Sequence, residues 1–143
     1  MGSIGVDEIT LTPLSRIAVN GGDVLHALKD TDIGFIDFGE AYFSVIEVGA
    51  IKAWKRHMIM TLNIVVPVGL ILFVFVDDRG RYRYEYIGLK NYARLTIPPG
   101  IWFGFKGVGN VDSLLLNIAD IKHDPAEVER KQLTEIFFDW ESP

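Results

Sequence analysis

The sequence predicts an all-β protein built as an antiparallel jelly-roll barrel. Strand patterns dominate residues 33–121, and glycines and prolines break them into short segments. Two of these segments, 62–66 and 70–77, are apolar at nearly every position, so both faces of each strand need cover. The chain of 143 residues suits one core. We therefore expect a single domain over 1–143 whose sheet also serves as a dimer interface.

The expected strands follow one another with short turns between them. Gly39 and Gly49 interrupt an alternating apolar pattern and are expected turns or bulges. A tight turn around Pro67 and Gly69 joins the two apolar strands. Tyrosines then alternate with charged residues, which is typical of a half-exposed strand. The strands expected after residue 80 are 81–86, 92–97, 101–105 and 113–121.

The triplet Pro98-Pro99-Gly100 forms a rigid turn directly before a run of aromatic residues. Such a turn fixes where the next strand begins. Because side chains alternate along a strand, Ile101, Phe103 and Phe105 should face one side and Trp102 the other. These rings form either an aromatic wall for a nucleotide base or sugar, or ordinary core.

Helix signals are sparse. Asp124 is a possible cap, Pro125 suits a first helical position, and Glu127 stands three residues after the cap. These residues predict a short C-terminal helix within 124–140 that begins at Asp124, and a second short helix is expected over 22–29.

The composition excludes several classes of function. A net charge of −5 does not fit a nucleic-acid-binding surface, and the absence of cysteine excludes disulfides and thiolate chemistry. The apolar stretch 60–76 is shorter than a membrane-spanning helix and contains Asn63, Pro67 and Gly69, so no membrane segment is expected. The first residues lack the pattern of a signal peptide, and a cytoplasmic location is expected.

Four stretches, in this order, resemble the dTDP-4-dehydrorhamnose 3,5-epimerase family. They are GAIKAWKRHMIMTLNIVVPVG, FVDDRG, LTIPPGIWFGFKGV and LLLNIADIKHDPAE, and the likeness covers about residues 35–130. The resemblance implies a cupin-type jelly roll, usually a homodimer. It also implies an enzyme that removes a proton next to the ketone of a nucleotide-linked 4-keto sugar and returns it on the opposite face. No metal or other cofactor is needed for that reaction.

The residues at the family's functional positions differ in this chain. Lys55 stands where the family has its histidine base, and Phe103 stands at a later histidine position. Asn117 lies near the family's tyrosine acid, and His123 lies near a second tyrosine. The fold is expected to be shared, whereas the specific 3,5-epimerase activity does not follow from the resemblance.

Lys55 and His57 are the expected catalytic residues. They lie two apart in one strand and therefore share a face, which is either the barrel interior or a charged, solvated edge. In the interior, His57 would act as the base and Lys55 as the cation that stabilises the enolate oxygen. Three histidines spread over the chain without an H-x-H pair predict no metal site.

Seven further residues are expected to contact substrate. Each also has a structural interpretation, as a turn contact, a buried amide or a part of the core. They are Glu40, Tyr42, Lys52, Asn63, Phe103, Asn117 and His123. Arg79, after Asp77 and Asp78, either closes a turn through an ion pair or contacts a phosphate.

Two classes of function remain open at this point. The first is an enzyme of nucleotide-sugar biosynthesis for surface polysaccharide, either an epimerase or a sugar 3,4-ketoisomerase on the same scaffold. The second is a non-catalytic cupin that binds a sugar nucleotide. The changed family positions favour the second class. The polar side chains kept within apolar strands, such as Lys55 and Asn117, favour the first.

Overall fold

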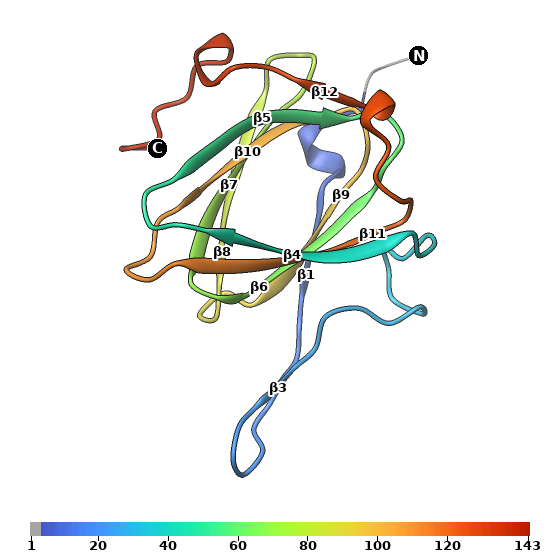
Figure 1. Ribbon diagram of the computed structural model, residues 1–143, viewed down its shortest axis with the longest axis vertical. Coiled ribbons are helices and arrows are strands. Elements are labelled where there is room, and N and C mark those ends of the chain that lie inside the picture. Colours follow the sequence, from blue (N-terminus) through green and yellow to red (C-terminus); the bar gives the residue numbers. More distant parts are fainter. Residues whose placement is uncertain (1–3) are drawn as a thin grey trace.

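Two five-stranded antiparallel sheets pack face to face in the computed structural model, which describes residues 4–143 (Figure 1). The first sheet has the order β1 (Thr10–Pro13), β9 (Ala93–Ile97), β6 (Leu62–Val68), β11 (Ser113–Ala119) and β4 (Glu40–Ile46). The second has the order β12 (Val128–Arg130), β5 (Ile51–His57), β10 (Trp102–Gly107), β7 (Leu70–Val76) and β8 (Tyr82–Gly88). The predicted fold class, an all-β jelly roll, is confirmed.

The predicted C-terminal helix is wrong, although its start signals are used. The Asp124 side chain accepts a hydrogen bond from the Ala126 backbone, but only the 3₁₀ turn η2 (Pro125–Glu127) follows. The next residues form β12, which pairs with β5, and the chain then makes a second 3₁₀ turn, η3 (Leu133–Glu135). Pairing with an open sheet edge satisfies the backbone of this segment and overrides its local helical preference. Within residues 4–143, no helix has the length and apolarity to cross a membrane.

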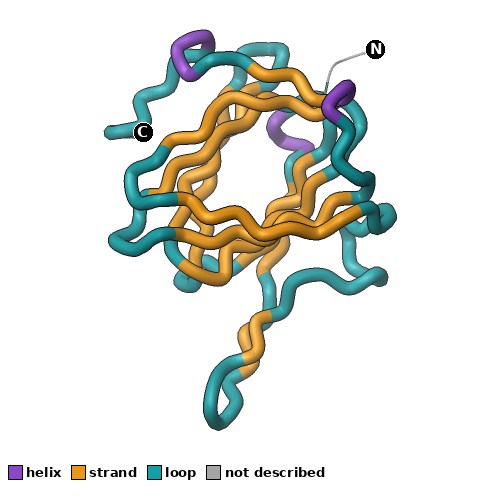
Figure 2. The backbone as a smooth tube through the Cα atoms, in the orientation of Figure 1, coloured by secondary structure: helices purple, strands orange, loops and turns teal. Residues whose placement is uncertain are grey.

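The helix expected over 22–29 is also wrong. That segment is one side of a small hairpin in which β2 (Arg16–Ile17) pairs with β3 (Val24–Leu25). Gly21 and Gly22 have φ values of +92° and +145°, which favour glycine and turn the chain back on itself. The hairpin projects away from the barrel (Figures 1 and 2).

The inner core fills the space between the two sheets. From β7 it receives Ile71, Phe73 and Phe75, and from the strand after the Pro-Pro-Gly turn it receives Phe103, all nearly inaccessible to solvent. Ile101 belongs to the same core and Phe105 packs against it. The prediction that Ile101, Phe103 and Phe105 face the same side is therefore confirmed.

A second apolar cluster lies on the outer face of the second sheet. Trp54 and Trp102 point outward there and are covered by the C-terminal strap, which we define as residues 131–142. Trp140 of the strap lies 5.5 Å from Trp54, measured between ring centroids, and the Trp54 indole donates a hydrogen bond to the Leu133 carbonyl. Both faces of β10 are thus buried, each against a different layer.

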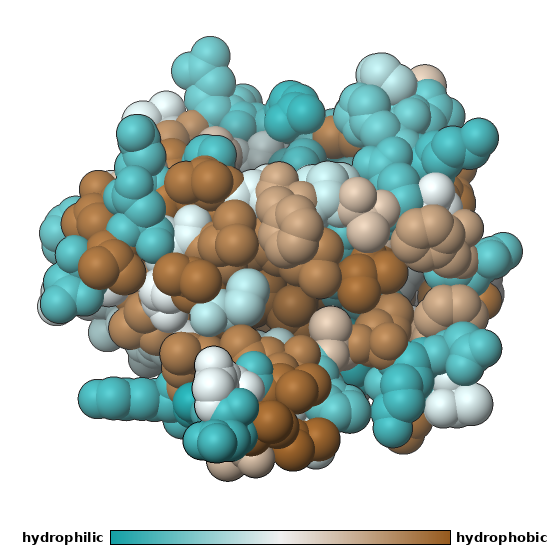
Figure 3. All heavy atoms as spheres, turned by 60° about the horizontal axis from the view of Figure 1, so that its bottom comes forward, coloured by the Kyte–Doolittle hydropathy of each residue, from teal (hydrophilic) through white to brown (hydrophobic). Residues whose placement is uncertain are grey.

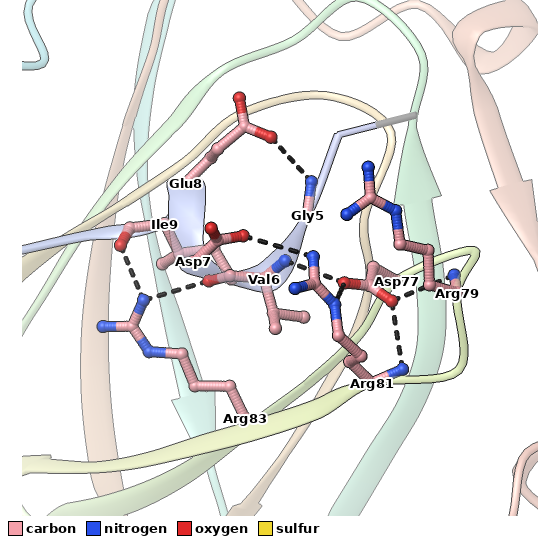
Figure 4. Close-up of polar contacts among 9 residues, drawn as sticks. All are labelled: Gly5, Val6, Asp7, Glu8, Ile9, Asp77, Arg79, Arg81 and Arg83. Carbon is pink, nitrogen blue, oxygen red and sulfur yellow. Dashed lines mark hydrogen bonds and ion pairs between the residues drawn. The ribbon is translucent and has the colours of Figure 1, made fainter. Parts of the chain in front are cut away.

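The N-terminal 3₁₀ turn η1 (Val6–Glu8) is held to the β7–β8 connection by the buried carboxylate of Asp77 (Figure 4). That carboxylate accepts hydrogen bonds from the Val6, Arg79 and Arg81 backbones and from the Arg81 guanidinium. Burial alone raises the pKa of Asp77, but these hydrogen bonds outweigh it and lower the pKa. Asp77 of the VDDR turn therefore pairs with Arg81, and Arg79 forms no ion pair within residues 4–143.

The outer face of the first sheet is apolar and largely open. Figure 3 shows apolar side chains gathered on this side, which lies at the bottom of Figure 1. Phe43 and Val45 of β4 are 64% and 58% exposed there. We call this surface the outer apolar face and define it by Phe43, Val45, Leu114, Leu116 and Ile118, which alternate with inward-facing residues of β4 and β11.

Candidate active site

A cavity of about 420 Å³ opens between the two sheets, where β4 and β12 form their edges. One wall consists of β4, β6 and β11, and the other of β5, β10 and β12. The apolar part of the lining comes from strand positions that also face the inner core. The full lining is Tyr42, Ser44, Lys52, Ala53, Trp54, Lys55, Leu62, Ile64, Phe103, Phe105, Leu115, Asn117, Arg130 and Lys131.

The cavity is positively charged. Lys52, Lys55, Arg130 and Lys131 all come from the β5–β12 wall, and none of the described residues that line the cavity is acidic. Burial is the main cause that lowers the pKa of Lys55, and the nearby positive charge of Arg130 lowers it further. This wall is suited to a ligand that carries several negative charges.

His57 lies at the end of β5, next to the cavity. It is 4% exposed, and its ring stacks on Phe103 with 6.2 Å between centroids. Phe103 lines the cavity, whereas His57 is not among the lining residues. Phe103 pairs directly with Lys55 across β10 and β5, so Lys55 and His57 project to the same inner face, as predicted.

Glu127 fixes the orientation of the His57 ring. One carboxylate oxygen lies 2.5 Å from His57 Nδ1, and the other accepts hydrogen bonds from the Ile59 and Met60 backbones. Burial raises the pKa of Glu127, but the hydrogen bonds from Met60, His57 and Ile59 outweigh burial and lower the pKa. The carboxylate is therefore ionised at neutral pH.

The same contact sets the tautomer of His57. Burial lowers the pKa of His57, although Glu127 acts in the opposite direction, so the ring is neutral at neutral pH. Its single proton then lies on Nδ1, where the carboxylate accepts it. Nε2 keeps a free lone pair, is fully buried, and has no hydrogen-bond partner among residues 4–143.

A phenol and an amide face the cavity from the opposite wall. Tyr42 of β4 and Asn117 of β11 are direct cross-strand partners, and Asn117 Nδ2 donates a hydrogen bond of 3.1 Å to the Tyr42 hydroxyl. Asn117 is 1% exposed, and its Oδ1 has no partner within the described chain.

The structure brings together most of the residues that the sequence singled out. Tyr42, Lys52, Lys55, Phe103 and Asn117 line the cavity, and His57 lies directly behind Phe103.

Three expected substrate contacts lie elsewhere. Asn63 points away from the cavity, where it binds Thr96 and the Gly34 carbonyl under the loop before β4. Glu40 accepts a hydrogen bond from the His123 backbone, and neither residue lines the cavity. These three residues therefore do not belong to the candidate site in this structure.

Sequence reasoning missed Glu127, Arg130 and Lys131. All three lie in the segment that was expected to be a helix. Because Glu127 stands three residues after the expected cap, its carboxylate was interpreted as part of the helix cap and not as a site residue. The alternation of Ile136, Phe138 and Trp140, which all pack on the outer cluster, was the signal for an extended segment. Within residues 4–143, no group of three or more histidine, aspartate or glutamate residues is placed to hold a metal ion.

The chain is similar to proteins that act on sugars. It is 30% identical to a probable low-salt glycan biosynthesis epimerase of Haloferax volcanii, over 90% of this chain and 87% of that protein. It is 39% identical to the dTDP sugar isomerase of Desulfovibrio desulfuricans, whose crystal structure superposes with a TM-score of 0.91 over 96% of this chain and 94% of the other.

More distant structures share the fold. The dTDP-4-dehydrorhamnose 3,5-epimerase of Sulfolobus tokodaii has a TM-score of 0.82 at 22% identity, over 98% of this chain and 84% of the other. A sugar 3,4-ketoisomerase of Thermoanaerobacterium thermosaccharolyticum has a TM-score of 0.77 at 16% identity, over 92% and 94%. No protein-family model matches the chain.

Proposed function

The chain belongs to the family of sugar-nucleotide epimerases and isomerases related to dTDP-4-dehydrorhamnose 3,5-epimerase, and on that premise we propose that it enolises a nucleotide-linked 4-keto sugar. The product would serve the synthesis of a surface polysaccharide or glycan. One observation carries the proposal. The buried His57 has its Nδ1 held by an ionised carboxylate, and its Nε2 lone pair has no partner among residues 4–143, beside a cationic cavity.

His57 has the properties that a general base needs. A neutral imidazole with a free Nε2 accepts a proton from carbon, and the Glu127 carboxylate stabilises the imidazolium that forms. As the C–H bond breaks, its electron pair forms the enolate double bond and the ketone π pair moves onto oxygen. The Lys55 ammonium on the same wall is the proposed partner of that oxyanion.

The remaining lining residues suit the rest of the substrate. Lys52, Arg130 and Lys131 lie on one wall, where they would pair with the diphosphate. The Phe103 and Phe105 rings offer apolar surface to the sugar or the base. A volume of about 420 Å³ lies within the usual range for small-molecule sites.

The test is solvent deuterium uptake into a panel of dTDP-, UDP- and GDP-linked 4-keto-6-deoxyhexoses. We expect uptake next to the ketone with the parent protein. His57→Gln should slow it by about 10²–10⁴-fold, the usual contribution of a general base, while nucleotide diphosphate binding changes little. Lys55→Met should slow uptake at least as much.

His26→Gln is the matched control, because this histidine lies outside the cavity and should leave uptake unchanged. If both site variants exchanged at the parental rate, the proton chemistry would have to be assigned elsewhere.

Product analysis in the same experiment separates the two reactions that share an enolate. Inversion at a carbon next to the ketone defines an epimerase. Movement of the carbonyl from C4 to C3 defines a ketoisomerase, in which one base on one face can serve both carbons. Among the described residues, His57 lies in β5 of the second sheet and the cavity-lining phenol of Tyr42 in β4 of the first, an arrangement that favours inversion.

We also propose that the protein is a homodimer that buries the outer apolar face. Its five defining members are all apolar side chains on neighbouring strands, and an exposed apolar surface of this kind marks an interaction site. The cytoplasmic location expected from the sequence stays a prediction.

A further inference from the structure

We propose that Asn117 determines substrate specificity, because its Oδ1 accepts a hydrogen bond from the C2 hydroxyl of the sugar. The inference rests on the proposed function for the kind of ligand, a nucleotide-linked hexose, and assigns one group of that ligand to one side chain. A site built in this way prefers a sugar that keeps its C2 hydroxyl over a 2-deoxy sugar.

Asn117 is a polar side chain in an apolar part of the cavity wall. It lies in β11 and pairs across the sheet with Ile64 of β6. The other cavity-lining residues of these two strands are Leu62, Ile64 and Leu115. Asn117 is 1% exposed, and a buried amide costs free energy unless its donor and its acceptor both find partners.

Only half of this requirement is met within the described chain. Asn117 Nδ2 donates a hydrogen bond of 3.1 Å to the Tyr42 hydroxyl, whereas Oδ1 has no partner among residues 4–143. The strand β11 lies between β4 and β6 and pairs with both, so the neighbouring backbone donors are engaged in the sheet. The cavity that Asn117 lines is therefore the place from which a donor would reach Oδ1.

The chemistry of Oδ1 restricts the ligand group that can pair with it. An amide oxygen only accepts hydrogen bonds. In a nucleotide-linked 4-keto sugar, the ketone, the ring oxygen and the ionised diphosphate are acceptors too. The donors of a 4-keto-6-deoxyhexose are its hydroxyls at C2 and C3. The nucleoside also has donors, and binding of the nucleoside diphosphate alone separates these from the sugar.

Of these two hydroxyls, the one at C2 is left unaltered by every reaction proposed for this site. Inversion at C3 moves the C3 hydroxyl to the other face of the ring, and a carbonyl shift from C4 to C3 consumes it. Asn117 is held in place by its strand and by Tyr42, so it suits a hydroxyl that keeps its position from substrate to product. It lies in the first sheet, across the cavity from Lys55 of the second, so it can hold the sugar apart from the proton chemistry.

The test compares two proteins and two ligands. Parent and Asn117→Leu are titrated by calorimetry with dTDP-glucose and with dTDP-2-deoxyglucose, which have no ketone and are not enolised. For the parent, loss of the C2 hydroxyl should weaken binding about 10–100-fold, the usual effect of leaving one uncharged buried acceptor without a donor. For Asn117→Leu, the same loss should change Kd by less than about threefold, because the interaction partner on the protein is already gone.

Leucine keeps nearly the shape of asparagine, and an unchanged Kd for dTDP shows that the variant is folded. Asn110→Leu is the matched control, because it makes the same replacement at an exposed amide outside the cavity. It should keep the full preference for the ligand with a C2 hydroxyl. Were Asn117→Leu not to fold, the parent would still be tested by its Kd values for the two ligands and for dTDP-3-deoxyglucose.

Equal binding of dTDP-glucose and dTDP-2-deoxyglucose by the parent would overturn the assignment. So would a loss seen with dTDP-3-deoxyglucose instead, or a loss of dTDP binding in folded Asn117→Leu, since Oδ1 would then serve C3 or the nucleoside. The proposed enolisation is judged separately by deuterium uptake. A parent that takes up no deuterium but prefers the C2 hydroxyl through Asn117 would refute the enolisation and leave this inference standing.

Discussion

At the scale of single residues, the candidate site depends on one buried histidine with two neighbours of opposite effect. The negative charge and hydrogen bond of Glu127 raise the pKa of His57, while burial and the positive charge of Lys55 lower it. The net shift is downward, so the base is neutral and ready to accept a proton at neutral pH. The two neighbours therefore make the pH profile a direct test of the arrangement.

We expect kcat/KM for enolisation to rise with pH through an acid limb whose midpoint lies below 6.5, the ordinary pKa of histidine. Glu127→Gln removes the contact that raises the pKa of His57, so the limb should move to lower pH. Lys55→Met removes a charge that lowers this pKa, so the limb of its residual activity should move to higher pH. Shifts in the same direction for both variants would contradict the assignment of His57 as the titrating base.

Asn63 shows why a site residue could not be assigned from the sequence. In β6 the side chains of Leu62, Ile64 and Val66 enter the inner core, and those of Asn63 and Val65 point the other way. Both faces of this strand are covered, so apolar residues occur on both and the alternation gives no direction. In β5, by contrast, Lys55 and His57 were correctly predicted to share one face. They are two residues apart in a strand, and this spacing alone puts two side chains on the same face.

At the scale of elements, strand positions were predictable and the C-terminal segment was not. The Pro-Pro-Gly turn placed the start of β10 and the opposite directions of Trp102 and Phe103 correctly, since these follow from local geometry. The segment after Asp124 carries good helix-start residues, yet its backbone pairs with the edge of β5. That pairing joins residues about 70 positions apart, and local signals do not contain it.

The N-terminal turn η1 is a second element fixed by a distant partner. Asp77→Asn keeps the shape of the side chain and removes the charge that four donors share. We expect the free energy of unfolding at pH 7 to fall by about 1–3 kcal/mol, the usual cost of weakening a buried charged acceptor. Urea denaturation would measure it. Asp78→Asn is the control, because Asp78 is half exposed and its ion pair with Arg56 contributes little.

The pH dependence of this difference has a defined sign. The folded-state pKa of Asp77 lies below its ordinary value of 3.8, so its contribution is fully present above that value. It is lost as the pH falls through the folded-state pKa. The gap between parent and Asp77→Asn should therefore close only in that acidic range, and a gap that closed near pH 6 would point to another group.

At the scale of the whole molecule, the outer apolar face predicts the assembly. A two-fold dimer would bring two copies of this face together and bury Phe43 and Val45. Sedimentation equilibrium should show a dimer at micromolar concentration. Phe43→Glu should dissociate it, because the dimer would bury two unpaired carboxylates.

Tyr86→Glu serves as the control for this experiment, since it adds the same charge on an exposed aromatic position of the other sheet. It should leave the dimer intact. A parent protein that sediments as a monomer at high micromolar concentration would rule out this interface.

The C-terminal strap gives the protein a built-in optical reporter. All three tryptophans of the chain, Trp54, Trp102 and Trp140, belong to the cluster beneath it, and the inner core between the sheets contains none. Intrinsic fluorescence therefore reports whether the strap is seated on the second sheet. Because Trp54 lies in β5 between Lys52 and Lys55, which line the cavity, the same emission also reports whether a bound ligand shifts this strand.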